Sequence, residues 1–405
     1  MLIVFVFGET MVRLWGPKYD KIKENLPPRK RKGSNISIRE KSEDFHHNLI
    51  PNTKAIMYRG EENLPPIVFE INNLGIRGQG VKKKSLDWER ILILGDSFIE
   101  NRLNNFEETV SKLFEKKISN KKIDVIQHGV SSWSPLTELN WYLKVGRTLK
   151  PDIVVLFLVI NDFYFADTYS QSDAAYEKEC IKDESGYPIR FSLKKASKKT
   201  SVENKPKSFI ERLGDKSKFF KWAYLTIEPL IERKLTQRQL KTLMRIRTTE
   251  FDRIAEKLFE NTREHKIKKD IIRLTRSENL WDEKTKKVVD EALANVNKLQ
   301  DVINKDGGKL VVTFIPIGWN FKDETIEGRI GYQFKKDLEI PMGGIEQKVK
   351  DFCGENNIQY INLYSAIKRY KEINSHKLYF QQDGHWNSMG NKVVADILYE
   401  NLFKK

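Results

Sequence analysis

The sequence predicts an α/β protein built on a parallel sheet. Three predicted strands carry this prediction, at 90–95, 123–127 and 153–160, and in the first of them Ile91 to Leu94 run without an intervening polar residue. Unbroken apolar runs are typical of strands that are buried on both faces of a sheet. Helical patterns at about 106–118 and 135–149 separate the three predicted strands, and this alternation favours right-handed crossovers between parallel strands.

The C-terminal part of the chain shows the same alternation of predicted helices and strands. We expect helices at about 284–304, 344–356 and 388–402 and strands at 309–315 and 358–363. Asn387 or Ser388 is the expected N-cap of the last helix, because both side chains can accept a hydrogen bond from its first turn.

Two segments depart from this pattern. Residues 17–88 are mostly polar and punctuated by Pro and Gly, so we expect residues 1–88 to form an irregular N-terminal arm with a short hairpin or strand. Residues 163 to about 283 contain aromatic-rich and basic helical patterns without a convincing apolar strand, and we expect a mainly helical insertion over one end of the sheet. Residues 89–405 then form one domain that the insertion interrupts.

The composition bounds the class of protein. The chain has 405 residues, 39% of them hydrophobic, which is enough for a core and excludes wholesale disorder. Its formal net charge is +16, and residues 191–276 hold more than twice as many basic as acidic residues. The charge therefore belongs mainly to the insertion, where it would favour an anionic partner. Cys180 and Cys353 are too few for a disulfide framework and have no metal-ligand spacing.

The chain begins with the apolar run MLIVFVF, which is too short to span a bilayer and lacks the basic region of a signal peptide. We interpret this run as a buried or interfacial start. The alternative is a shortened membrane anchor, because the basic run at 29–32 would suit an anionic membrane face. On that alternative the arm is membrane-proximal at its start.

Polar or small residues follow the ends of the predicted strands: Ser97, Gly129 and Asn161, with Asp383 and His385 just before the last helix. The carboxyl ends of neighbouring parallel strands meet at one crevice, so we expect the first three to converge. A serine needs an imidazole to take its proton and a partner to orient that imidazole. It also needs donors where negative charge develops, and the Ser97 and Gly129 N–H groups and the Asn161 amide would supply them.

This order of motifs resembles that of the SGNH hydrolases, also called the GDSL lipase/esterase family. The matching blocks are GDSF at 95–98, the glycine of HGVSSW, the asparagine of VINDF, and DGHWN near the C terminus. The resemblance covers about 90–162 and 309–402. It implies a three-layer α/β/α sandwich with a parallel, flavodoxin-like sheet, and ester hydrolysis or acyl transfer without a cofactor or a metal.

The resemblance also implies a role for each site residue. It assigns Ser97 as the nucleophile, His385 as the general base and Asp383 as the acid that orients it. The oxyanion hole would consist of Ser97, Gly129 and Asn161. The stretches NNLGIRG at 72–78 and PNTK at 51–54 are similar to the N-terminal arm of the branch that includes many envelope-glycan esterases.

Two features depart from the family pattern. Phe98 stands where the family's named motif has leucine, and we expect its side chain to pack behind the turn. One residue separates Asp383 from His385, where many members have two. In an extended segment, positions i and i+2 project to the same side, so Asp383 would still reach His385. The alternative is a Ser/His dyad in which Asp383 is only a loop carboxylate.

Other polar residues have competing interpretations. His128, next to Gly129, is the strongest competing base. Asp96 adjoins Ser97, so it cannot approach the same histidine from the far side, and we interpret it as a turn former. Gly129 alone could serve a tight turn, and Asn161 could cap the following segment. His46 and His47 lack clustered Cys, Asp or Glu at ligand spacing, so we expect no metal there.

The sequence therefore predicts a serine esterase or acyltransferase with an acyl-enzyme intermediate. Its partner would be a small-molecule or glycan acyl ester, or a lipid, with the basic insertion as a lid that favours anionic substrates. The alternative is a non-catalytic scaffold that binds an anionic polymer or membrane through that insertion. Nucleic acid is disfavoured, because no zinc-finger spacing or aromatic RNA signature is present. The family resemblance slightly favours a membrane or cell-envelope location; oligomeric state is left open.

Overall fold

The structure is a computed structural model, and it describes residues 32–61, 64–163, 168–171, 174–177, 180–191, 273–325, 339 and 342–404. All of these belong to one compact unit formed by residues 28–196 and 267–405. The apolar start of the chain and residues 192–272 of the predicted insertion lie outside the described residues, and so do the predictions made for them.

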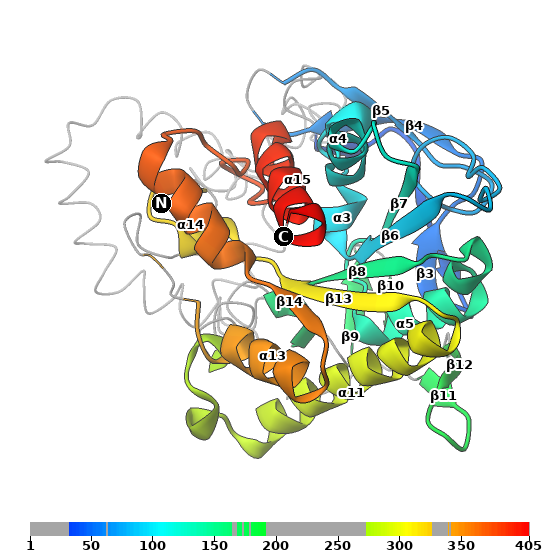
Figure 1. Ribbon diagram of the computed structural model, residues 1–405, viewed down its shortest axis with the longest axis vertical. Helices are drawn as coiled ribbons and strands as arrows, with labels where there is room; N and C mark the ends of the chain where they lie inside the picture. Colours follow the sequence, from blue (N-terminus) through cyan, green and yellow to red (C-terminus); the bar gives the residue numbers. More distant parts are fainter. Residues whose placement is uncertain are drawn as a thin grey trace, which may run out of the picture. The chain divides into compact units, whose positions relative to one another are not determined.

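A five-stranded, fully parallel sheet forms the centre of this unit (Figure 1). Its strands, in chain order, are β6 (Glu89–Gly95), β7 (Ile123–Gly129), β8 (Ile153–Leu158), β13 (Lys309–Phe314) and β14 (Gln359–Ile361). In space the order is β14-β13-β8-β6-β7. When the five strands are numbered 1 to 5 along the chain and read from the β7 edge, the order is 2-1-3-4-5. This order is flavodoxin-like and confirms the predicted sheet. The strand order reverses between β6 and β8, and ligands collect at such a switch point.

Helices cover both faces of the sheet, which confirms the three-layer sandwich (Figure 1). One face carries α4 (Val110–Lys117), α14 (Leu363–Ile373) and α15 (Ser388–Phe403); the other carries α5 (Pro135–Lys144), α11 (Glu283–Lys305) and α13 (Gly344–Glu355). Capping side chains fix where the longest helices begin. Asp282 accepts a hydrogen bond from Thr285 N at the start of α11, and Asn387 accepts one from Gly390 N at the start of α15.

Some elements differ from the sequence prediction. Helix α14 was not predicted; it begins directly after β14, where Asn362 caps it by accepting from Ser365 N at 2.8 Å. The described start of the insertion is not helical. It contains two antiparallel hairpins, β9 (Thr168–Gln171) with β10 (Ala174–Glu177) and β11 (Cys180–Lys182) with β12 (Pro188–Phe191). In the second hairpin the Asp183 side chain accepts a hydrogen bond from Tyr187 N, which closes a turn that helical periodicity does not predict.

The described part of the N-terminal arm is more regular than expected. It forms a three-stranded antiparallel sheet and a separate hairpin: β1 (Lys32–Ser34), β4 (Lys54–Arg59) and β5 (Ile67–Glu70), and β2 (Arg39–Ser42) with β3 (His46–Leu49). In β5, Ile67 and Phe69 are buried while Val68 and Glu70 are exposed, so one face of the small sheet packs inward. Phe69 belongs to the same hydrophobic core as the strands of the main sheet.

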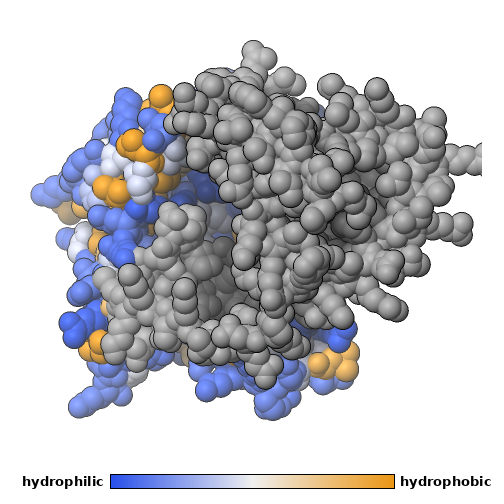
Figure 2. Space-filling model, turned by 180° about the vertical axis from the view of Figure 1, so that it is seen from behind, coloured by the Kyte–Doolittle hydropathy of each residue, from blue (hydrophilic) through white to orange (hydrophobic). Residues whose placement is uncertain are grey.

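Figure 2 shows the hydropathy of one face of the described residues. In the view of Figure 2, its coloured part is mainly hydrophilic, and the hydrophobic spots are small. Among the described helices, none combines the length and the apolar character needed to cross a bilayer.

Candidate active site

Ser97 lies at the carboxyl end of β6, on the first residue of the four-residue helix α3 (Ser97–Glu100). Asp96 forms the turn between them: its Oδ1 accepts a hydrogen bond from Phe98 N at 3.0 Å and so caps α3. This confirms Asp96 as a turn former. Because helix α3 begins at Ser97, the serine side chain is held at the switch point of the sheet rather than within the strand.

His385 faces Ser97 from the segment before α15. Its Nε2 lies 2.7 Å from Ser97 Oγ, across 288 residues of sequence. On the other side of the ring, Nδ1 is hydrogen-bonded to the Asp383 carboxylate. The Asp383 side chain is 4% exposed and that of His385 is 26% exposed, so the carboxylate is shielded while the imidazole still reaches solvent. The three side chains form one continuous chain of hydrogen bonds.

The Asp383–His385 contact arises from a turn, not from the extended segment that the sequence suggested. Gly384 has φ +81°, a left-handed conformation that glycine adopts without strain. Phe380 N donates to the His385 carbonyl at 2.8 Å, and Gly384 N donates to the Phe380 carbonyl at 3.1 Å. Glu61 of the arm accepts hydrogen bonds from the main-chain N–H of Asp383 and of its neighbour. The turn therefore brings the two side chains together despite the single intervening residue.

The hydrogen-bond pattern determines what each atom can do. When Nδ1–H of His385 donates to Asp383, Nε2 carries a lone pair and can accept the Ser97 hydroxyl proton. Ser97 Oγ also lies 3.1 Å from Asp96 Oδ2, but a hydroxyl has one proton and the contact with His385 is shorter. The guanidinium of Arg102 lies 3.9 Å from Asp383 Oδ2, while Asp383 Oδ1 binds His385.

Phe98 does not only fill space behind the turn. Its ring lies 4.6 Å from the His385 ring and 5.0 Å from the Trp386 ring, between centroids. The side chain is buried. The position after the serine therefore supports one face of the imidazole.

Gly129 ends β7 directly beside Gly95, and the close approach of α3 requires a residue without a side chain there. A Cβ at this position would lie 2.5 Å from Glu100 N and 2.6 Å from the Asp96 carbonyl oxygen. Both are main-chain atoms, which cannot move aside as a flexible side chain can. The structure thus brings Gly129 against the Ser97 turn.

Asn161 follows β8, in the short 3-10 helix Ile160–Phe163. Its Nδ2 donates to Asp96 Oδ2 at 2.8 Å. This bond uses one of the two amide hydrogens and orients the side chain toward the Ser97 turn. The three predicted oxyanion residues therefore gather around one turn, from three adjacent strands.

Glu100 joins the turn after Ser97 to the turn after Gly129. Its carboxylate accepts a hydrogen bond from Ser131 N at 2.6 Å and binds the guanidinium of Arg39 from the arm. Burial acts to raise the pKa of Glu100, but Arg39, Arg102 and the Ser131 hydrogen bonds outweigh it, so the pKa lies below the usual value. Glu100 is therefore a buried, ionised link that the sequence analysis did not single out.

A second link joins the Ser97 turn to the His385 turn. Asn101 Nδ2 donates to Asn391 Oδ1 on α15 at 2.7 Å, and Asn104 Nδ2 donates to the Trp386 carbonyl at 2.8 Å. The sequence signal for this link is only the asparagine-rich stretch NRLNN at 101–105. Amide pairs of this kind cannot be recognised until both partners are in place.

His128 is not placed to act as the competing base. It is 1% exposed, and its ring stacks on Trp141 with the centroids 4.2 Å apart. Burial lowers its pKa to about 3, against a smaller opposing effect of Glu100. A neutral imidazole packed among tryptophans serves the core. His47 is likewise structural, because its Nε2 lies 2.9 Å from the Ser131 carbonyl.

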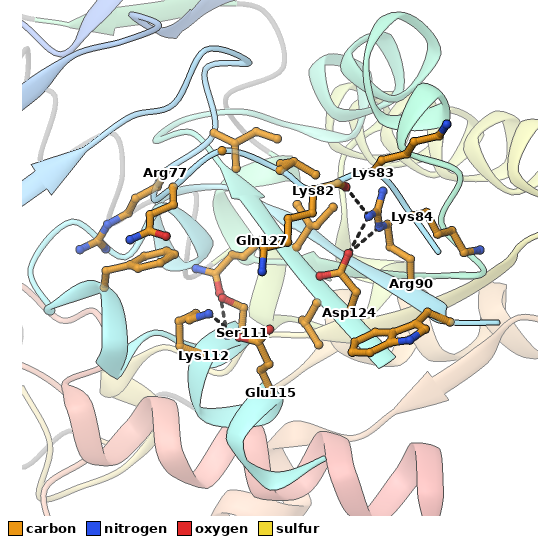
Figure 3. A pocket seen from close by; sticks show the side chains of 18 of the residues that line it. Arg77, Lys82, Lys83, Lys84, Arg90, Ser111, Lys112, Glu115, Asp124 and Gln127 are labelled. Carbon is orange, nitrogen blue, oxygen red and sulfur yellow. Dashed lines mark hydrogen bonds and ion pairs between the residues drawn. The ribbon is translucent and has the colours of Figure 1, made fainter. Parts of the chain in front are cut away.

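A pocket of about 540 Å³ lies beside edge strand β7, between the arm and α4 (Figure 3). Its lining includes Arg77, Lys82, Arg90, Lys112 and Gln127, and Ser97 is not among the lining residues. Gln127 Nε2 also donates to the Ile99 carbonyl of α3. This pocket thus borders the back of the Ser97 turn rather than the side that faces His385. Within the described ranges, no three His, Cys, Asp or Glu side chains are grouped so as to hold a metal ion.

The fold and the site define the chain as an α/β/α sandwich in which a serine, a histidine and an aspartate are hydrogen-bonded in series at the carboxyl edge of the sheet. No protein-family model matches the sequence, and no curated protein does.

Solved structures similar to the chain include G-D-S-L proteins and acetyl esterases. A member of the lipolytic protein G-D-S-L family from Veillonella parvula DSM 2008 is 10% identical, with a TM-score of 0.36 over 78% of this chain and 100% of that chain. The acetyl xylan esterase AlAXEase is 12% identical, with a TM-score of 0.36 over 78% and 100%. A variant of the acetyl-xylooligosaccharide esterase Axe2 from Geobacillus Stearmophilus is 11% identical, with a TM-score of 0.37 over 80% and 97%.

Because the TM-scores are below 0.5, the chemistry of this chain is inferred from its own side chains.

Proposed function

We propose that the chain is a serine esterase or acyltransferase of the SGNH type. One observation carries the proposal: His385 Nε2 lies 2.7 Å from Ser97 Oγ while Asp383 binds Nδ1. Ser97 Oγ attacks the ester carbonyl carbon, and His385 takes the hydroxyl proton. The imidazolium that forms is stabilised by Asp383. His385 then gives the proton to the leaving alcohol, and the acyl group stays on Ser97.

The second half of the reaction reverses these roles. A water molecule or a second hydroxyl gives its proton to His385 and attacks the acyl-enzyme carbonyl, and Ser97 regains its proton on release. In each half, negative charge develops on the carbonyl oxygen. We assign its donors to the Ser97 and Gly129 N–H groups and to the second amide hydrogen of Asn161. Loss of one such donor typically costs about 3 kcal/mol of transition-state stabilisation.

The proposed substrate is an acyl ester of a small molecule, a glycan or a lipid, and hydrolysis and transfer use the same residues. A panel of p-nitrophenyl esters of increasing chain length, with and without an added sugar acceptor, would separate these cases. Release of p-nitrophenol reports the first half of the reaction, and an acylated sugar in the products reports transfer.

The test replaces the proposed nucleophile. We expect Ser97→Ala to abolish both turnover of p-nitrophenyl acetate and labelling by a fluorophosphonate probe, because the acyl-enzyme cannot form. Ser388→Ala is the matched control: Ser388 is exposed at the first residue of α15, three residues beyond His385, and should keep both activities. Retained turnover in folded Ser97→Ala protein would refute the proposal.

The rival function, polyanion or membrane binding by a non-catalytic scaffold, rests on the basic insertion, most of which lies outside the described residues. It predicts a wild-type chain that is not labelled by the probe but binds polyanions with a steep dependence on salt. The same labelling experiment therefore separates the two functions.

A further inference from the structure

Arg77 lies in the NNLGIRG stretch of the arm, yet its hydrogen bonds go to the segment that follows Ser97. Its guanidinium donates to the main-chain carbonyls of Glu100, Asn101 and Asn104, at 3.3, 2.5 and 2.6 Å. These carbonyls lie at and just beyond the C-terminal end of α3, where a positive charge is favourable. The Arg77 side chain thus binds three main-chain carbonyl groups of the segment that follows Ser97.

The segment that Arg77 holds is the one that connects Ser97 to His385. The side chain of Asn101 is paired with Asn391 of α15, and that of Asn104 donates to the carbonyl of Trp386, the residue after His385. Asn101 itself has φ +54°, an uncommon conformation for a residue other than glycine. Arg77 donates to the carbonyls of both asparagines and so holds the main chain from which their side chains project.

The arm is built to present Arg77. Asn72 Oδ1 accepts hydrogen bonds from the N–H groups of Leu74 and Ile76, which closes the loop just before Arg77. The guanidinium then lies over the Phe69 ring, with its carbon 4.5 Å from the ring centroid. The three hydrogen bonds that this guanidinium donates within the described residues all go to main-chain carbonyls. Burial lowers the pKa of Arg77 to about 9, although Glu100 and Glu108 oppose this effect.

We propose that Arg77 is a positioning residue for the reaction, which sets the separation of Ser97 Oγ and His385 Nε2 by holding residues 100–104. The inference rests on the proposed function of Ser97. A side chain that only stabilised the fold could be replaced at a cost in stability alone. Arg77 acts on Ser97 and His385 through the main chain. Its loss should therefore lower the rate at saturating substrate by more than the loss of another buried arginine that lowers stability to a similar extent.

The strand that leads to Ser97, β6, offers a matched control for Arg77. Arg90, near the amino end of β6, is also buried and also donates to two main-chain carbonyls, those of Lys82 and Leu149, besides binding Asp124. In Figure 3 the two arginines lie on opposite sides of the pocket beside β7. Arg90 therefore matches Arg77 in burial and hydrogen bonding but lies far along β6 from Ser97.

The experiment compares Arg77→Lys with Arg90→Lys in the full-length chain. Lysine keeps the charge but cannot span three carbonyls at fixed angles. Both variants should have a lowered Tm. We expect Arg77→Lys to lose roughly 10–100-fold in kcat for p-nitrophenyl acetate, as expected for a misplacement of the order of 1 Å, with little change in KM. Arg90→Lys should keep kcat within about threefold of the wild-type value, which is well separated from the loss expected for Arg77→Lys.

A second variant tests the guanidinium directly. Arg77 lines the pocket of about 540 Å³, so a free guanidinium ion can reach the space left in Arg77→Ala. Guanidinium chloride below denaturing concentrations should restore part of kcat to Arg77→Ala and none to Arg90→Ala. If Arg77→Lys and Arg90→Lys lose activity in the same proportion as they lose stability, and no rescue occurs, the positioning role is wrong.

Failure of the proposed function gives a different result. If Ser97 of the wild type is neither labelled nor needed for turnover, the esterase assignment fails. Amide hydrogen exchange still tests whether Arg77 holds residues 97–104 in place, because this measurement does not need turnover. The amides of 97–104 should exchange faster in Arg77→Lys than in Arg90→Lys, with β8 equally protected in both. Equal exchange of 97–104 in the two variants would overturn the inference.

Discussion

Substitution of His128 tests whether this histidine has a structural role or acts as the catalytic base. The ring is buried against Trp133 and Trp141, with centroids 4.9 and 4.2 Å away, and neither ring nitrogen has a hydrogen-bond partner within the described residues. The perturbation is His128→Phe, which keeps an aromatic ring of similar size and removes the titrating group. We expect this variant to remain active, whereas loss of His385 should abolish turnover.

The size of the stability effect follows from the pKa of His128. Burial lowers that pKa from 6.5 to about 3, so unfolding takes up a proton between these two values. The stabilisation from the neutral form is then fully present above pH 6.5 and is lost as the pH falls toward 3. Between pH 7 and pH 5, linkage makes His128 responsible for a loss of about 2 kcal/mol in the free energy of unfolding.

The assay is urea denaturation of the wild type and of His128→Phe at pH 7 and pH 5. Buried or paired carboxylates also titrate in this range, but they contribute equally to both proteins and cancel in the difference. The wild type should lose about 2 kcal/mol more than the variant between the two pH values. Equal losses would show that the His128 pKa is not lowered by burial, and a His128→Phe enzyme without activity would return this residue to the list of candidate bases.

Two further substitutions test the site. Gly129→Ala places a methyl group within 2.6 Å of main-chain atoms of α3, so it should cost about 1–3 kcal/mol of stability and slow turnover. The control is Gly354→Ala in α13, where a Cβ meets nothing within 4 Å, and this variant should be neutral or stabilising. Similar stabilities of the two variants would refute the steric argument. Asp383→Asn should lower kcat by roughly 10²–10⁴-fold without a comparable loss of stability, because the amide no longer stabilises the imidazolium; full activity would instead favour a Ser97–His385 dyad.

The sandwich could be predicted because its strands and most of its helices are marked locally. A glycine or a polar residue closes these apolar runs in the sequence: β6 ends at Gly95, and the run that contains β8 continues through Ile160 to Asn161. Helix α14 was missed because its apolar residues follow β14 without an intervening glycine or proline, and the Asn362 cap is the only boundary signal. The hairpins at 168–191 were missed because their strands are only three or four residues long.

The site could be predicted only in part, for a physical reason. Ser97, Gly129 and Asn161 follow strand ends, and topology alone brings such positions together. The Asp383–His385 pair depends on the local backbone instead. An extended segment and the turn at Gly384 both allow the contact, and the sequence DGH does not choose between them.

The asparagine pairs that link the Ser97 turn to the His385 turn have little local signature in the sequence. The two reacting atoms are 288 residues apart in the sequence, so their 2.7 Å contact has to be fixed by other pairs that cross the same gap. Asn101 with Asn391 and Asn104 with the Trp386 carbonyl span 290 and 282 residues. A single asparagine favours caps and turns and predicts nothing about a distant partner. Such a pair has meaning only once the sheet has formed, so it can be read from the structure and not from the chain.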